Sequence, residues 1–576
     1  MTELEKIREL KNLSDLAIYL GYTAKGLSYI LYKDENKYHH FDIPKKNGKK
    51  RKISAPNPRL KDVQKRLANK LSLCQEELMK NTRKMTTPSH GFVKGFSIFS
   101  NARIHTKKRY VLNIDLEDFF PSINFGRVRG FFIKNKYFKL SEAVSTIIAQ
   151  IACYENSLPQ GSPCSPIIAN LIAHSLDMQL IALAKKYHMF YTRYADDLTF
   201  SSNVKTFPSD FINEAGKLGN KLVKTIEAFG FKVNQQKVRV SHRSSRQEVT
   251  GLVVNEHINT KKEYYRLARS LCHSLFFGKE CYVKNSDGTK TEMFAENVEG
   301  IINFIYETKS SRNRFLIDEI KKNEKSIGMY KKIFGKDYID QIRKCEKRYY
   351  RYSDVSISVA LRGIQKLYAE FLIWKYFIDN KKPVIITEGK TDIIYIKCAI
   401  KQLKENHRLL YCDNEYNVFF LNPDSILSKF TELLGGTDKL KKIIDQYKSI
   451  LKHFRVFSPR NPIIIVCDDD NDGRKVVTAK DNIEKEEKLN NLYVITIPHS
   501  FTQDDNFYIE KYFSHRELDK EINGKKFNPA NKGINHETEY SKQVFATKVI
   551  YKNRNNIDFS RFDELLSKIE ECIKKI

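Results

Sequence analysis

The sequence has no C-x-x-C pair, and its ten cysteines are scattered along 576 residues, the nearest two being Cys272 and Cys281. That spacing argues against a zinc module or a disulfide framework and favours a reducing compartment. The N-terminus lacks the basic-then-apolar order of a signal peptide. The longest apolar runs, such as Pro462 to Val466, have the length of strands and are too short to span a bilayer. We therefore expect a cytoplasmic protein with no membrane partner.

Positive charge is what the sequence has in excess. It contains 100 Lys and Arg against 69 Asp and Glu, a net charge of +31. Such an excess predicts a polyanionic partner, with nucleic acid as the first candidate and an anionic membrane surface as the second. The chain also exceeds the ~250–300 residues at which single hydrophobic cores stop growing, so several domains are expected.

Two adjacent acids, Asp196 and Asp197, lie between β-branched and aromatic residues in the stretch from Tyr191 to Ser202. The pattern predicts a hairpin with both carboxylates at its turn. Neighbouring like charges are costly unless a cation lies between them, and a divalent metal is the usual solution. An isolated Asp-Asp pair is more often a solvated turn, so the rest of the chain decides its meaning.

A second acidic stretch supports the metal interpretation. The apolar run Tyr110 to Ile114 predicts a strand that delivers Asp115 at its end, a rigid place from which to aim a carboxylate. Asp115 facing the Asp196-Asp197 pair would give three acids around two Mg²⁺ ions roughly 3.5–4 Å apart. Glu117 and Asp118 are interpreted as surface or supporting acids.

These stretches, with Leu158-Pro159-Gln160-Gly161-Ser162-Pro163-Cys164-Ser165-Pro166 and the apolar helix predicted from Ile167 to Leu180, resemble the palm of a reverse transcriptase. The L-P-Q-G-x-x-x-S-P block of that family matches along its whole length. The resemblance implies a right-hand fold of fingers, palm and thumb. It also implies dNTP substrates, an RNA template and two Mg²⁺ ions as cofactors.

The resemblance also implies residues that contact the incoming nucleotide. Gln160 and Gly161 would approach it, and Phe120 would lie beneath its sugar and exclude a ribose 2′-hydroxyl. In the predicted basic hairpin around Asn47-Gly48, Arg51 is preferred for the triphosphate over Lys49 and Lys52. Lys237, near the pyrophosphate in the family, could equally be a surface lysine.

Two short signatures resemble the retron subgroup, which makes a branched RNA–DNA hybrid. Asn101-Ala102-Arg103-Ile104-His105, which by chemistry alone predicts a polar turn, matches N-A-x-x-H, and Val249-Thr250-Gly251 matches V-T-G. The resemblance implies that Asn101, His105, Val249, Thr250 and Gly251 take part in recognition of a cognate structured RNA. Group II intron and diversity-generating enzymes are the competing subgroups, although no Cys-rich endonuclease module is present.

Residues 256–380 are predicted to be a helical, basic thumb and linker. From Lys309 to Arg351 there are 14 Lys and Arg against 6 Asp and Glu, an imbalance that suits phosphates. Flat rings that suit unpaired bases are interleaved there. These rings belong to Tyr330, Phe334, Tyr338, Tyr349, Tyr350 and Tyr352. For any single residue, a solvated helical face or a core tyrosine is the competing interpretation.

After Lys381-Lys382-Pro383 the pattern changes to strand–acid–helix units. Val384 to Thr387 and Ile463 to Cys467 predict buried strands, followed by Glu388-Gly389-Lys390-Thr391-Asp392 and by Asp468-Asp469-Asp470-Asn471-Asp472-Gly473. Such units predict a parallel α/β sheet with ligands at the carboxyl ends of its strands. An EF-hand is excluded, because a strand precedes the acidic loop and its twelfth position is Ala479.

The E-G-x-x-D and D-x-D-x-x-G pair resembles a Toprim domain, and Gly435-Gly436-Thr437-Asp438 fits its nuclease-like members. The resemblance implies a site for Mg²⁺ or Mn²⁺ at Asp468 and Asp470, with Glu388 as ligand or general acid–base. Asp392, Asp472, Glu510 and Lys542 are further candidates. No topoisomerase tyrosine can be selected among 31 tyrosines, which favours phosphodiester hydrolysis over strand passage.

The predicted fold is therefore α/β and multidomain, with a helical N-terminal cap (1–40), reverse-transcriptase fingers and palm (41–255), a helical basic region (256–380) and a Toprim-like effector (381–576). The predicted function is a bacterial retron reverse transcriptase that copies its cognate non-coding RNA into msDNA. Its Toprim nuclease would act in anti-phage defence, and homo-oligomerisation is left open. The alternatives are a catalytically idle Toprim scaffold and a stand-alone polymerase with a primase or repair role.

Overall fold

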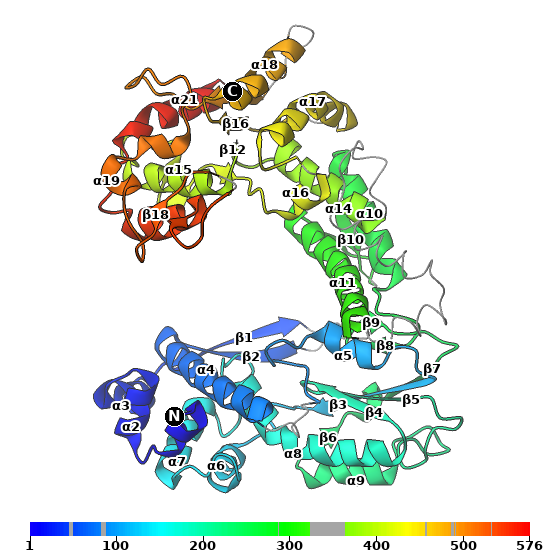
Figure 1. The fold of residues 1–576 in the computed structure, drawn as a ribbon. Helices are drawn as coiled ribbons and strands as arrows, with labels where there is room; N and C mark the ends of the chain where they lie inside the picture. The colour runs from blue at the N-terminus through cyan, green and yellow to red at the C-terminus, as the bar shows by residue number, and fades with distance from the viewer. Residues whose placement is uncertain are drawn as a thin grey trace. The chain divides into compact units, whose positions relative to one another are not determined.

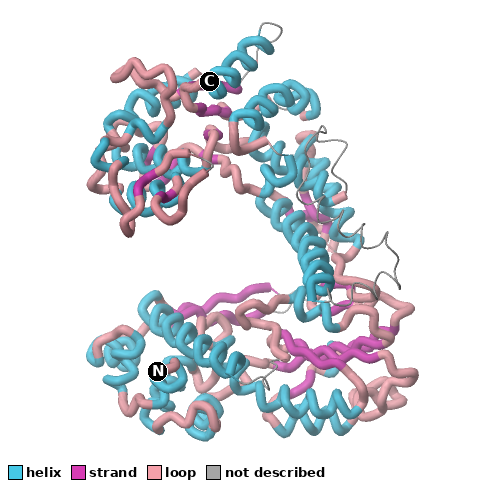
Figure 2. Tube along the Cα trace, viewed as in Figure 1, coloured by secondary structure: helices cyan, strands magenta, loops and turns pink. Residues whose placement is uncertain are grey.

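The computed structural model describes residues 1–44, 50–81, 88–285, 287–322, 363–431, 433–454, 458–484, 489, 491–530 and 533–575. They form two compact units, one of Met1–Lys261 with Thr308–Phe315 and one of Lys262–Glu307 with Leu316–Ile576 (Figures 1 and 2). The predicted Asn47-Gly48 turn, Lys49 and the aromatic residues from Tyr330 to Tyr352 lie outside the described residues.

The first unit begins with the predicted helical cap, made of α1 (Glu3–Arg8), α2 (Leu13–Leu20) and α3 (Ala24–Tyr32). Each helix starts at a side chain that accepts a backbone N–H, which satisfies an otherwise unpaired donor. For α2 this residue is Asn12. Apolar residues at helical spacing on α2 and α3 form a buried stripe, made of Leu16, Leu20, Leu27 and Ile30.

The predicted basic hairpin is formed by β1 (Tyr38–Pro44) and β2 (Lys50–Pro56), which pair antiparallel from Tyr38↔Pro56 to Pro44↔Lys50. The long helix α4 (Pro58–Asn81) follows and contacts both β2 and the N-terminal helices.

A five-stranded antiparallel sheet is the centre of the first unit. Its central strand β3 (Tyr110–Glu117) pairs with β5 (Asp197–Ser202), β6 (Lys232–Val233) and β7 (Arg239–His242), and β4 (Phe190–Tyr194) pairs with β5. The helices that share its core include α1 to α4 and, after them, α6 (Phe125–Lys134), α7 (Glu142–Ala152), α8 (Ser165–Lys186) and α9 (Asn220–Ala228). The remaining elements are α5 (Ile98–Ile104), the 3₁₀ turn η1 (Gln235–Lys237) and the hairpin of β8 (Glu248–Val249) and β9 (Leu252–Val253).

Helix α8 corrects the expectation that every apolar run is too short to span a bilayer. Within the described ranges it is the one helix long and apolar enough to do so. Most of its apolar window is buried, and Ile168, Leu176 and Leu180 belong to the core. Its apolar character is thus explained by packing beneath the sheet.

The second unit contains a four-stranded sheet in the order β15-β12-β16-β17, and every pairing in it is parallel, as predicted. Its strands are β12 (Val384–Thr387), β15 (Phe419–Phe420), β16 (Ile463–Cys467) and β17 (Leu492–Thr496). Along β12 and β16, alternate residues enter two different hydrophobic clusters, so both faces of the sheet are covered.

The elements around this sheet are mostly helical. They include α10 (Lys262–Phe276), α11 (Ala295–Lys322), α14 (Ile364–Ile373), η3 (Trp374–Ile378), α15 (Lys390–Gln402), α16 (Ile426–Thr431), α17 (Thr437–His453), α18 (Asn471–Glu484) and α21 (Asp563–Lys574). Short elements are β10 (Tyr282–Lys284), β11 (Lys290–Glu292), β13 (Tyr411–Cys412), β14 (Glu415–Tyr416), η4 (Ile509–Tyr512), α19 (His515–Leu518), β18 (Lys526–Phe527), β19 (Glu539–Tyr540), α20 (Lys542–Val544), η5 (Phe545–Tyr551) and η6 (Ser560–Phe562).

The helices before residue 381 share a core with the sheet after it. The rings of Tyr306 and Tyr368 pack on Phe430, and Phe276 packs on Phe454. The contact division at Lys261/Lys262 lies close to the predicted boundary between residues 255 and 256. It has no counterpart at the predicted boundary at residue 381, because aromatic contacts far apart in the sequence join the regions on either side of it.

Candidate active sites

The acidic hairpin of the first unit has the predicted form. Tyr194 pairs with Asp197, so Ala195 and Asp196 make the turn. Asp115 lies directly opposite Asp197 in the β3–β5 register, and the Leu116 N–H donates to the Asp196 carbonyl at 3.0 Å. Strand β3 continues two residues beyond Asp115 because Leu116 and Glu117 pair with β6. The sheet register thus places Asp115, Asp196 and Asp197 next to one another along the backbone of two paired strands.

Electrostatics couples these acids. The pKa of Asp197 rises to about 7, because protein surrounds its carboxylate and because Asp196 and Asp115 repel its negative charge. Its side chain still reaches solvent. The pKa of Asp196 is also raised, mainly by burial, while the positive charges of Lys237 and Arg51 oppose the shift. Two neighbouring ionised acids therefore lack full compensation by protein cations.

Lys237 contacts the acid group directly. Its Nζ lies 2.9 and 2.8 Å from the two oxygens of Asp115, and this hydrogen bond raises the pKa of the lysine. Among the residues that the structure describes, no three His, Cys, Asp or Glu side chains converge as a ready-made metal site. The donor set still fits Mg²⁺, because hard oxygen ligands on three mutually repelling carboxylates are what that ion prefers.

The hairpin rests on a buried ion pair that the sequence analysis missed. Arg193 is fully buried and donates to Asp177 from Nε at 2.9 Å and from Nη2 at 2.8 Å. Its Nη1 donates to the carbonyl of Ala195 in the acidic turn at 3.1 Å and to Asn170 Oδ1 at 3.0 Å. A lone Asp within the apolar helix α8 was the available signal, since such a charge is rarely buried unless it is paired.

Two of the segments that carry predicted nucleotide residues are bonded to each other. Gly161 has φ +120°, and a Cβ there would lie 2.8 Å from the Ser54 carbonyl of β2, so glycine permits the close approach. The Ser54 N–H donates to the Gln160 carbonyl at 2.8 Å, which ties the P-Q-G turn to the strand that carries Arg51. Phe120 is partly buried against Phe119 and Phe92.

The two retron-type signatures lie side by side. Asn101 to His105 forms the end of α5 and not the predicted polar turn, because Ser97 caps that helix at the N–H of Ser100. Helix α5 contacts the β8–β9 hairpin, where Thr250 and Gly251 both have positive φ and form its two-residue turn. Asn101 and His105 are fully buried, so no direct RNA contact is open to their side chains in this structure.

A polar cavity of about 470 Å³ connects the acids with the second signature. Asp115, Asp197 and Lys237 line one part of it. The other lining residues are Asn113, Ile114, Arg239, Ser241, Arg246, Glu248 and Thr250. Thr250 therefore faces the same space as Asp115 and Asp197.

The second acidic site lies at one edge of the parallel sheet. Thr387 of β12 is in register with Val466 of β16, so Glu388 and Asp468 follow adjacent strand ends. Burial raises the pKa of Glu388 and, well above its usual range, that of Asp468. Glu388 Oε2 is buried and has no hydrogen-bond partner. An orphaned carboxylate oxygen among other acids fits a cation ligand.

Three of the further predicted residues, Glu510, Lys542 and Asp392, also belong to this site. Glu510 is fully buried, with Lys542 Nζ 3.0 Å from its Oε2. The neighbouring Ile509 N–H donates to Asp468 Oδ1 at 3.0 Å. The pKa of Asp392 rises to about 7 because of burial and then repulsion by Glu510.

The end of the D-x-D-x-x-G motif has a structural explanation. Asp470 Oδ1 accepts the N–H groups of Asp472 at 3.0 Å and of Gly473 at 2.7 Å, which caps α18. A Cβ at Gly473 would lie 2.0 Å from the Asp468 carbonyl, so only glycine fits there. Asp472 is exposed and pairs with Lys475, and its negative charge is a minor cause of the raised pKa of Glu388.

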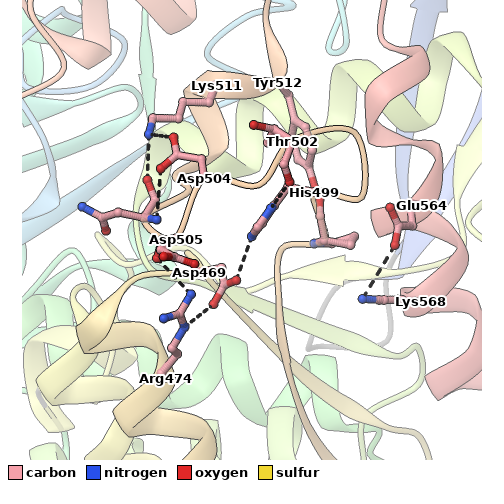
Figure 3. Close-up of polar contacts among 12 residues, drawn as sticks. Asp469, Arg474, His499, Thr502, Asp504, Asp505, Lys511, Tyr512, Glu564 and Lys568 are labelled. Carbon is pink, nitrogen blue, oxygen red and sulfur yellow. Dashed lines mark hydrogen bonds and ion pairs between the residues drawn. The ribbon is translucent and has the colours of Figure 1, made fainter.

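Asp469, between the two predicted ligands, has other partners that the sequence analysis missed (Figure 3). It accepts Arg474 Nε at 2.7 Å and contacts His499 Nε2 at 2.8 Å. The hydrogen bond to Arg474 is the main cause that lowers the pKa of Asp469, and the hydrogen bond to Asp469 raises the pKa of His499. These contacts hold the loop around residues 499–507 against the end of β16.

Comparison with known proteins identifies the first unit. A family model described as "Reverse transcriptase (RNA-dependent DNA polymerase)" matches residues 43–263. The retron Ec86 reverse transcriptase of Escherichia coli is 33% identical over 327 residues, which cover 55% of this chain and 91% of that protein. The retron Mx162 reverse transcriptase of Myxococcus xanthus is 32% identical over 339 residues, covering 54% and 67%.

A telomerase structure from Candida albicans shares 12% identity with this chain at a TM-score of 0.30, and the match covers 58% of this chain and 60% of that one. A TM-score this low does not show a shared fold. The match to the Ec86 enzyme, which covers 91% of that protein, does show the family. This chain belongs to the retron reverse transcriptases.

Proposed function

We propose that Asp115, Asp196 and Asp197 are the catalytic carboxylates of this reverse transcriptase and that they bind two Mg²⁺ ions. The observation that carries the proposal is the β3–β5 register, which sets Asp115 opposite Asp197 beside the Asp196 turn. Mg²⁺ bound there would lower the pKa of the primer hydroxyl and neutralise the triphosphate. Lys237 would exchange its ion pair with Asp115 for the departing pyrophosphate.

The residues around the acids would hold the incoming dNTP. Arg51 is within electrostatic reach of Asp196, which supports it over Lys52 as the residue for the triphosphate. Gln160 and Gly161 would contact the nucleotide from the turn that is bonded to β2. Phe120 would exclude ribonucleotides by volume.

Replacement of Phe120 tests this pocket. Phe120→Val should admit ribonucleotides and reduce discrimination against them by about 10- to 100-fold, because truncation removes a steric clash. Single-nucleotide incorporation of dNTP and rNTP measures the ratio, with Phe131→Val in α6 as a control outside the site. Unchanged discrimination would move the sugar-selecting residue elsewhere.

The natural product follows from the family. We propose that the enzyme copies part of a cognate structured RNA into a branched RNA–DNA hybrid and that the Val249-Thr250-Gly251 turn takes part in recognising this RNA. Thr250 supports this because it lines the cavity that contains the acids. Sequencing the nucleic acid that co-purifies with the protein is the test, and unbranched or heterogeneous nucleic acid would contradict the proposal.

For the second unit we propose a Toprim-like, metal-dependent phosphodiesterase. Glu388, Asp468 and Asp470 would hold Mg²⁺ or Mn²⁺, which would activate water against a phosphodiester. The orphaned Glu388 oxygen supports this assignment. Lys542, paired with Glu510, would keep a positive charge next to the acids.

The biological role proposed for this second activity is an anti-phage effector that the intact hybrid keeps silent. Degrading the hybrid in the purified complex, with Mg²⁺ or Mn²⁺ present, should release cleavage of cellular RNA or DNA. Glu388→Ala should abolish this cleavage and leave hybrid synthesis unchanged. If no cleavage appears, or if it persists in the Glu388 variant, the alternative of an idle assembly scaffold gains support.

A further inference from the structure

The acidic hairpin has a polar partner on each face. Successive residues of a strand point to opposite faces, and on one face Tyr191 and Arg193 bond to Asp177 of α8. On the other face, Thr192 and Ser201 lie at diagonal positions, since Thr192 is paired with Thr199 and Ser201 follows two residues later. Each lies four residues from the nearer acid of the turn.

One imidazole joins this diagonal pair. His105 Nδ1 lies 2.7 Å from Ser201 Oγ, and its Nε2 lies 2.7 Å from Thr192 Oγ1. All three side chains are buried, with 0%, 0% and 1% of His105, Ser201 and Thr192 exposed. One ring thus binds both strands that carry the catalytic turn.

The ring is neutral at physiological pH, because burial lowers the pKa of His105 to about 3. A neutral imidazole has one donor and one acceptor, and hydroxyls can serve as either, so both contacts are satisfied in either tautomer. The contacts are therefore independent of pH over the working range of a polymerase. This differs from the use of histidine as a titrating acid or base.

The same face continues towards the V-T-G hairpin. Thr199 Oγ1 donates to Asn113 Oδ1 at 3.2 Å, and Asn113 Nδ2 donates to the Glu248 carbonyl of β8 at 2.9 Å. Helix α5, which ends at His105, contacts β4, β8 and β9. Polar side chains thus link the catalytic hairpin to α5 and to β8.

We propose that His105, the histidine of the N-A-x-x-H signature, is a positioning residue for polymerisation: it fixes β4 and β5 against α5 and so sets the place of Asp196 and Asp197. The inference rests on the proposed role of those acids. It gives the signature a function beneath the active site instead of at an RNA-binding surface. A displacement of about 1 Å at reacting groups can cost about 100-fold in rate.

The test separates positioning from stability. His105→Leu keeps similar volume but leaves two buried hydroxyls unsatisfied, which destabilises the fold. Adding Thr192→Val and Ser201→Ala removes those hydroxyls and should recover the unfolding midpoint. We expect kcat for primer extension to stay about 100-fold low in both the single and the triple variant. The KM for an RNA–DNA primer–template should remain within about twofold, and half-saturation by Mg²⁺ should need several-fold more ion.

Ile148→Val in α7 is the control for stability, because Ile148 is buried in the core of the same unit and belongs to neither the hairpin nor α5. Should His105→Leu fail to fold, His105→Gln can still reach one hydroxyl and is expected to fold with kcat about tenfold low. Wild-type kcat in the triple or the Gln variant would overturn the inference, as would a raised KM for RNA at unchanged kcat. Asp197→Asn in the same assay shows whether the acids are catalytic. If Asp197→Asn is active, the proposed catalytic site is wrong. If Asp197→Asn is inactive while His105→Leu is fully active, the site stands and only the role of His105 is wrong.

Discussion

The two acidic sites of this molecule use different architecture to hold carboxylates together. In the first unit, antiparallel register sets Asp115 beside Asp197, and the available cation, Lys237, is 56% exposed in its side chain. In the second, parallel strand ends carry the acids, and the cation Lys542 pairs with a Glu510 that is wholly buried. The first site leaves its acids open to ions and substrate from solvent, whereas the second has part of its counter-charge built into the core.

The largest expected effect separates the polymerisation proposed for the first unit from the phosphodiester cleavage proposed for the second. Asp197→Asn retains shape but removes a charge that we propose binds Mg²⁺, which should reduce polymerisation by about 10³-fold or more. Primer extension with Mg²⁺ and dNTPs measures the loss. Near wild-type extension would contradict the assignment. Asp468→Asn in the second unit is the matched variant and should leave extension unchanged.

Removing each lysine should show the difference in counter-charge. Lys542→Met leaves the buried Glu510 carboxylate without its cation and should cost about 3–5 kcal/mol in the free energy of unfolding. Lys237→Met breaks an exposed pair and should cost about 0–1 kcal/mol. Chemical denaturation with hydrogen exchange at β12 and β16 measures the first change. Equal losses in the free energy of unfolding for both lysine variants would contradict the difference in counter-charge between the two sites. The double variant Lys542→Met with Glu510→Leu should recover most of the stability lost in Lys542→Met, because it also removes the buried carboxylate.

The pH dependence of primer extension should report on the first acidic site, which contains Asp197. With a pKa of about 7, Asp197 is half protonated near neutrality, so extension at limiting Mg²⁺ should fall about tenfold per pH unit well below pH 7. The folded state binds this proton more tightly than the unfolded state does. The contribution of Asp197 to stability therefore decreases as pH rises from the ordinary carboxyl pKa to about 7. Asp197→Asn should lose this pH dependence of stability, and an unchanged profile in the variant would refute it.

The smallest expected effect tests which acids of the second unit belong to the proposed metal site. Asp472 is exposed and paired with Lys475, so Asp472→Asn should change metal-dependent cleavage by less than about twofold. Asp470→Asn can still cap α18 and should abolish cleavage, since only the charge is removed. If both substitutions have the same effect, the metal site extends along the loop.

Much of the molecule could be predicted from local patterns. The acidic hairpin, the strands β12 and β16 and the apolar stripe of α2 and α3 follow from alternation, turn residues and helical spacing within a few positions of each other. The end of α5 was misjudged as a turn because its polar letters suggested a loop, although Ser97 and Ser100 form a capping pair. Signals of this kind come from residues close together in the sequence and do not depend on contacts with distant parts of the chain.

Local sequence patterns predicted which acids cluster within each motif, a nucleic-acid partner and a parallel sheet after residue 381. The groups that support these acids from distant parts of the chain became apparent in the folded molecule. Lys237 meets Asp115 from 122 residues away, and His105 meets Thr192 and Ser201 from 87 and 96 residues away. Such pairings depend on sheet register and helix packing, which bring together residues whose separation in the chain carries no periodic signal.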